Sequence, residues 1–130
     1  MSRELLVVEP FGPAEPAGGA WLTSWRARNI GPLAVRVIAA IAPHSKYRSD
    51  EKELALDLAP GTAAAFTLLV RVEGAPGEEI ENAFVIVQFA QGDDRFRALA
   101  RLRVRLDSAA RPHPVLESHS TQRVGFSGEL

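Results

Sequence analysis

The fold of this chain is decided by the stretch Asn82-Ala-Phe-Val-Ile-Val-Gln-Phe-Ala-Gln-Gly-Asp-Asp-Arg-Phe-Arg-Ala-Leu-Ala-Arg-Leu-Arg-Val-Arg-Leu106. It predicts a strand over residues 82–90, a turn over 91–94 and a second strand over 95–106. In the second strand apolar residues alternate with arginines, which is the period of two of a half-buried strand. The outward face would carry Arg95, Arg97, Arg101, Arg103 and Arg105, with Leu99 between them. The stretch therefore predicts an antiparallel hairpin with one face in the core.

The turn fixes which residues of the two strands face each other. A two-residue turn at Gly92 and Asp93 and a four-residue turn over 91–94 both give the same register. On the inner face Phe89 then meets Phe96. The outer face pairs Gln88 with Arg97, Ile86 with Leu99, Phe84 with Arg101 and Asn82 with Arg103. A slip of one residue would bring arginines into the core, so this register is strongly specified.

The rest of the chain continues the same pattern of short alternating segments. Further strands are expected over residues 5–8, 21–28, 33–42, 54–58 and 62–72, with turn signals roughly every ten residues. The inward faces would include Trp21 with Trp25, then Leu33, Val35, Val37 and Ile41, and then Phe66, Leu68, Val70 and Val72. A helix over 50–58 is the alternative for one segment, but the alternation of Leu54, Leu56 and Leu58 favours a strand. The predicted fold class is all-β, an antiparallel two-sheet sandwich of about seven strands.

Residues 1–106 are predicted to form the sandwich domain, and residues 107–130 a polar tail. Such a tail is either partly disordered or adds as an edge strand to a sheet. Its weak strand candidates are residues 114–116 and 122–126. Val115 with Leu116, and Val124 with Phe126, are its apolar anchors.

Two short motifs resemble those of bacterial immunoglobulin-like and fibronectin-III-like sandwich domains. They are Trp-x-x-x-Trp-x-x-x-Asn-x-Gly-Pro over residues 21–32 and Leu-x-Leu-x-Pro-Gly-Thr over residues 56–62. The resemblance covers about residues 5 to 106. It implies a sandwich fold but no particular function, because such folds host adhesion, assembly, sugar-binding and chaperone roles.

Composition excludes several classes of protein. The chain has 130 residues with a net charge of −1, so no overall field draws it to nucleic acid or to membranes. It has no cysteine, which excludes disulfides and thiolate metal sites. It lacks the about twenty successive apolar residues of a membrane span, and it lacks a secretory signal. We expect a cytoplasmic protein, and the abundance of arginine and alanine suggests a bacterial source.

Catalytic and metal-binding signals are absent from the sequence. His44, His113 and His119 are the only imidazoles, and no two of them stand at a recognised ligand spacing. The acidic pairs at residues 78–79 and 93–94 are typical of solvated turns rather than of a calcium site. No serine stands in a nucleophile elbow, so we expect no enzyme, no cofactor and no metal.

The outer face of the hairpin is the best candidate for a functional surface. Phe84, Ile86 and Leu99 would form an apolar centre, and Arg97, Arg101 and Arg103 would surround it. Ile38 of the neighbouring strand would extend the centre. An apolar centre with an arginine rim is the composition of a protein interface. The other interpretation is a solvated arginine stripe whose stems cover a few apolar residues.

These residues predict a non-enzymatic interaction or assembly module whose partner is another protein or a second copy of the chain. The alternatives are an anion or nucleic acid bound by the arginine ladder, and a carbohydrate stacked on Trp21 and Trp25. The net charge and the shortage of exposed aromatic residues argue against nucleic acid.

Overall fold

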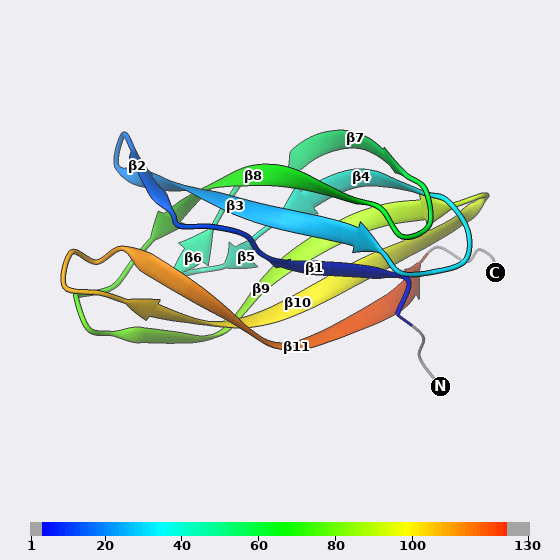
Figure 1. Cartoon of the computed structure of the whole chain (residues 1–130). Coiled ribbons are helices and arrows are strands. Elements are labelled where there is room, and N and C mark those ends of the chain that lie inside the picture. The colour runs from blue at the N-terminus through cyan, green and yellow to red at the C-terminus, as the bar shows by residue number, and fades with distance from the viewer. Residues whose placement is uncertain (1–3, 125–130) are drawn as a thin grey trace.

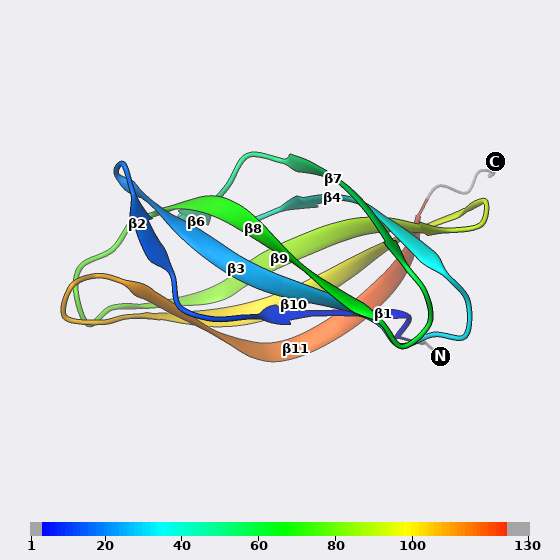
Figure 2. The same cartoon turned by 45° about the horizontal axis from the view of Figure 1, so that its top comes forward.

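The computed structural model describes residues 4–124, and this part of the chain forms two antiparallel β-sheets packed face to face (Figures 1 and 2). The strands are β1 (Leu6–Pro10), β2 (Glu15–Ala17), β3 (Ala20–Asn29), β4 (Val35–Ile41), β5 (Pro43–His44), β6 (Tyr47–Arg48), β7 (Lys52–Leu58), β8 (Ala63–Val72), β9 (Glu79–Gln91), β10 (Asp94–Leu106) and β11 (Pro112–Val124). No helix occurs among residues 4–124.

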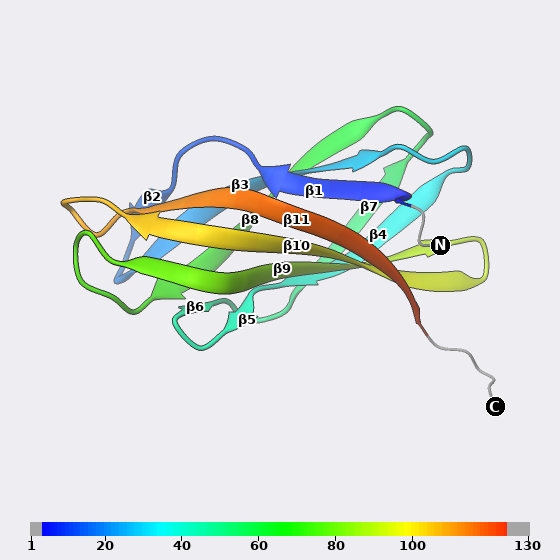
Figure 3. The ribbon, with the colours of Figure 1, turned by 90° about the horizontal axis from the view of Figure 1, so that it is seen from below.

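One sheet has the order β1-β3-β8-β6-β5, with β2 paired to β3, and the other has the order β11-β10-β9-β4-β7. Figure 3 shows the second sheet from outside, with β11, β10 and β9 lying side by side. All pairings are antiparallel. The predicted all-β two-sheet sandwich is therefore confirmed.

The hairpin of β9 and β10 has the predicted register through its central part. Phe89 pairs with Phe96 and Ile86 with Leu99. The two phenylalanine rings stack with centroids 5.3 Å apart. Gly92 has φ of 60°, and glycine adopts this left-handed region without strain, which is what a two-residue hairpin turn requires.

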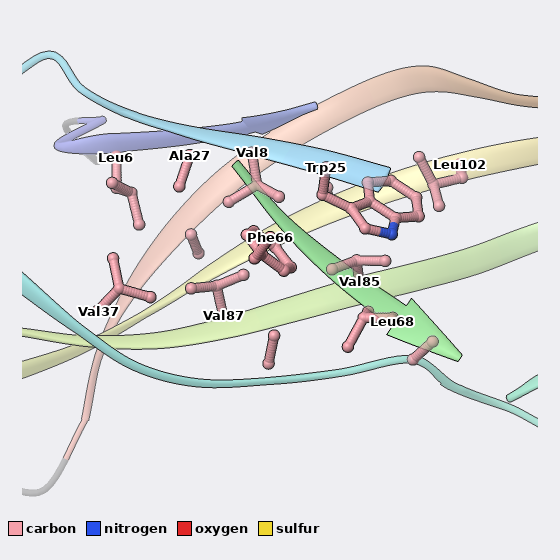
Figure 4. Close-up of a cluster of buried hydrophobic side chains, with 14 of the residues drawn as sticks. Leu6, Val8, Trp25, Ala27, Val37, Phe66, Leu68, Val85, Val87 and Leu102 are labelled. Carbon is pink, nitrogen blue, oxygen red and sulfur yellow. The ribbon is translucent and has the colours of Figure 1, made fainter. Parts of the chain in front are cut away.

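The core lies between the sheets and is filled by the inward residues of both (Figure 4). Trp25 of β3 is completely buried there. Its indole Nε1 donates to Oγ1 of Thr23 at 2.8 Å, and that hydroxyl donates to the carbonyl of Leu68 at 2.9 Å. Tyr47 is equally buried, and burial raises its pKa well above the usual range.

The prediction for β4 was partly wrong. Val35 and Val37 are buried as expected, but the register shifts by one residue between Val37 and Ala39. A β-bulge of this kind reverses the alternation of side chains beyond it. Ile41 therefore pairs with Ile86, an outward residue, instead of pointing into the core. Leu33 precedes the strand and is exposed.

Short strands also occur between the predicted ones. β2 lies in the glycine- and proline-rich segment after β1, and β5 and β6 form a small hairpin in the polar segment after β4. The 54–58 segment is strand β7, so the helical alternative is wrong. Residues 112–124, part of the segment named above as a tail, form β11, which lies at the edge of the second sheet beside β10. Phe126 lies outside the described residues.

Asn29 connects the two sequence motifs and the two sheets. Its buried side-chain amide donates to the carbonyls of Leu33 and Leu58, each at 2.9 Å, and its Oδ1 accepts from the amide of Gly31. Its backbone amide donates to the carbonyl of Thr62, and its carbonyl accepts from Gly61. The Asn-x-Gly-Pro motif thus meets the Leu-x-Leu-x-Pro-Gly-Thr motif at this residue.

We expect the isosteric substitution Asn29→Asp to destabilise the protein by roughly 3–5 kcal/mol, because it buries a charge and leaves two carbonyls without donors. Chemical denaturation measures the change. The matched control is Asn82→Asp, since Asn82 is exposed and its oxygen still accepts from Arg101 after the change. Equal effects of the two substitutions would contradict this role of Asn29.

Candidate functional site

The outer face of the second sheet carries an apolar row that crosses three strands. Ile86 of β9 pairs with Ile41 of β4 on one side and with Leu99 of β10 on the other. All three are half-buried, as is Phe84, which lies two residues before Ile86 on the same face of β9. We call these four residues the apolar row. The sheet thus brings together the three predicted apolar residues and adds Ile41, which the β4 bulge places there.

The arginines beside the apolar row are hydrogen-bonded to neighbouring strands. Arg97 Nη2 donates to Gln122 Oε1 at 3.2 Å. Arg101 Nη1 donates to Asn82 Oδ1 at 3.0 Å, and its Nε donates to Ser118 Oγ at 3.1 Å. These bonds hold the exposed guanidinium groups along the sheet surface rather than leaving them free in solvent.

Two β-bulges supply partners for these arginines. The pairing of β10 with β9 shifts beside Arg103, so Asn82 does not meet Arg103 as predicted but bonds Arg101. The pairing of β10 with β11 shifts between Arg101 and Leu102, which leaves Glu117 as the extra residue. Glu117 Oε2 lies 3.3 Å from Nε of Arg103. Each bulge therefore places an acceptor beside an arginine of β10: Asn82 beside Arg101, and Glu117 beside Arg103.

The sequence contained only part of the signal for this site. Alternation on β10 identified the arginines and Leu99. The partners Ser118 and Gln122 belong to β11, where small and polar residues alternate so weakly that the strand was indistinct. Ile38 lies at the β4 bulge and is half-buried. Ile41, rather than Ile38 as predicted, is therefore the residue of β4 in the apolar row.

The residues of the carbohydrate hypothesis do not form an exposed pair. Trp25 is buried in the core, and Trp21 is half-buried with the guanidinium carbon of Arg111 5.5 Å from its ring centroid. Within residues 4–124 no cluster of three histidines or acids could hold a metal ion.

A groove of about 570 Å³ opens between β7, an edge strand of the second sheet, and β8 of the first sheet. It is lined by apolar residues that include Leu54, Leu56 and Phe66. Along residues 63–69 β8 pairs only with β3, so its other edge is without a strand partner in the described chain. Lys52 Nζ donates to the carbonyl of Thr67 at 3.0 Å and thereby covers part of this edge.

Asp107 forms a polar cluster at the turn between β10 and β11. One carboxylate oxygen lies 2.8 Å from His113 Nε2, and the other accepts from the backbone amides of Ala109 and Arg111. The bond to His113, followed by the two backbone bonds, lowers the pKa of Asp107 from 3.8 to about 2. The cluster shapes an exposed turn in which Ala110 has φ of 60°.

Comparison with protein-family models, characterised proteins and solved structures finds no match for this chain. In the described residues no helix is suited to crossing a bilayer. The fold defines the class, a two-sheet β-sandwich.

The first prediction from this site concerns the bulge at Asn82, whose φ is 59°. Asn82→Ala should destabilise the protein by about 1–2 kcal/mol, because alanine is strained in this region and the bond to Arg101 is lost. Asn82→Gly loses the same bond without the strain, so its effect should be smaller by about 1 kcal/mol. Denaturation of both variants measures the difference, and equal losses would contradict strain at this position.

The second prediction concerns acid titration of Asp107. Because its pKa is lowered by folding, its contribution to stability is present above about pH 4 and lost as the pH falls through about 2. His113→Ala should raise the pKa of Asp107 from about 2 toward 3.8, because it removes the hydrogen bond that lowers this pKa most. NMR titration of the carboxyl carbon measures this, and an unchanged midpoint would exclude His113 as the main cause.

Proposed function

We propose that this chain is a non-enzymatic protein-interaction module that docks a partner on the outer face of β9 and β10. The observation that carries the proposal is the apolar row. An outward sheet face is normally polar, whereas here Ile41, Ile86 and Leu99 stand in register across three strands. Apolar centres with arginine at their margins are typical of the central part of protein interfaces.

The hydrogen-bonded arginines support the same proposal. A side chain that is already held along the surface loses less conformational entropy when a partner binds. Arg101, held by Asn82 and Ser118, is the best ordered by this criterion. The arginines at the margin of the apolar row are thus ordered before a partner binds.

The charges favour a different protein over a second copy. The outer face of β10 presents five arginines, of which Arg103 is paired with Glu117 of β11. Two copies meeting face to face would bring these rows against each other, and like charges at an interface cost several kcal/mol. The partner that fits has an apolar centre and an acidic rim, and self-association is the competing outcome of the experiment below.

Strand order supports an immunoglobulin-like assignment within the sandwich class. β1, β3 and β8 lie in one sheet, and β4, β9 and β10 lie in the other, with the last two joined as a hairpin. Sandwiches of that type commonly use sheet faces and loops for binding. The cytoplasmic location and the bacterial source stay predictions from the sequence.

Leu99→Arg tests the proposal, because it places a charge in the apolar row without touching the core. The matched control is Leu69→Arg on the outer face of the other sheet, where Leu69 is 52% exposed. Crosslinking in an extract of the native source should recover a partner with the unaltered protein and with Leu69→Arg but not with Leu99→Arg. Equal recovery by both variants would refute this docking face.

The solution mass of the unaltered protein separates the two kinds of partner. A monomer that loses its crosslinked partner on Leu99→Arg fits the acidic-partner proposal. A dimer that becomes a monomer on Leu99→Arg would replace it with self-association. Binding of a labelled oligonucleotide at low salt, weakened by Arg95→Ala, would instead favour the arginine-ladder alternative.

A further inference from the structure

The edge strands β1 and β11 belong to different sheets but lie alongside each other (Figures 1 and 3). They are not paired as strands, yet one hydrogen bond joins them directly. The backbone amide of Val8 in β1 donates to Nε2 of His119 in β11 at 3.0 Å. Val8 itself is fully buried, so this bond lies at the margin of the core.

The geometry determines which nitrogen of His119 carries a proton. A backbone amide can only donate, so Nε2 must present its lone pair to Val8. The ring proton is then on Nδ1, which lies 2.6 Å from Oε1 of Glu4 and donates to it. Thr121 Oγ1 donates to the same carboxylate oxygen at 3.2 Å. His119 is thus neutral in the bonded arrangement.

We propose that His119 is a proton-sensitive latch between β1 and β11. Protonation of Nε2 removes the acceptor and turns two N–H groups toward each other. The side chain is only 10% exposed, so water replaces the lost partner poorly. The imidazolium keeps its contact with Glu4, so acid releases the Val8 end of the latch while the Glu4 end holds.

Glu4 is the one charged group that contacts His119 within residues 4–124. The residue opposite His119 on β10 is Ala100, which is buried and uncharged. The other charged groups near these strands bind elsewhere: Glu9 to Arg26 and Arg28, Glu117 to Arg103, and Arg123 to Asp94. The state of the latch therefore depends on the proton of His119 and on Glu4.

Imidazole is the side chain that ordinarily changes charge between about pH 5 and 8. The latch is therefore closed while the His119 ring is neutral and released when it is protonated. Release loosens the edge strand that contributes Leu6 and Val8 to the core. This inference does not depend on the proposed docking face, which lies on the outside of the second sheet.

NMR of the whole chain between pH 8 and 5 tests the latch at the residues that form it. The expected result is that the Val8 amide signal moves with the same midpoint as the His119 ring signals. Hydrogen-exchange protection of Val8, corrected for the intrinsic rate, should fall roughly five- to tenfold across that midpoint. The amide of Val87, on a central strand, serves as the internal control and should not change.

His119→Gln is the matched variant, because an amide offers one acceptor and one donor and does not titrate. It should keep Val8 protected at both ends of the pH range, whereas His119→Leu should leave Val8 unprotected at both. Fluorescence of the buried Trp25 confirms that each variant is folded. A Val8 amide that is unchanged from pH 8 to 5, or a glutamine variant with the same pH dependence as histidine, would overturn the proposal.

Discussion

The period-two alternation of β10 is the constraint on which the second sheet depends. Its inward residues from Phe96 to Leu106 are buried, and they alternate with outward residues, five of which are arginines. A slip by one residue would bury several unpaired guanidinium groups, each at a cost of several kcal/mol. Because the register of β10 is specified, the bulges occur in the neighbouring strands β9 and β11. The extra residues at these bulges, Asn82 and Glu117, bind arginines of β10.

Asn29 plays the corresponding part between the sheets. Apolar packing holds two sheets together but does not by itself specify how their ends meet, because it is non-directional. The buried amide of Asn29 adds direction, since each of its bonds requires a carbonyl or an amide at a defined place. This explains why two motifs separated in the chain, which the resemblance to known sandwich domains singled out, converge on a single residue.

The sequence was sufficient for the features that depend on local alternation and on one turn. The register from Phe84 to Phe89 follows from the hairpin alone, and with it the position of Leu99 beside Ile86. It was insufficient where a bulge intervenes, because nothing in the residues around Ile38 marks the shift that sends Ile41 outward. It was also insufficient for β11, whose alternation is weak and whose pairing is specified by β10 rather than by its own residues.

The two sides of the sandwich are closed by different means, and this has a consequence for solubility. On one side β1 and β11 lie alongside each other and are joined by the hydrogen bond from Val8 to His119. On the other side residues 63–69 of β8 have an edge without a strand partner within residues 4–124, and Lys52 places an ammonium group there. A free edge is a template for further strands, and lysine is a common residue with which natural sheets prevent such growth. The ammonium group of Lys52, bound to Thr67, therefore opposes the addition of another strand at this edge.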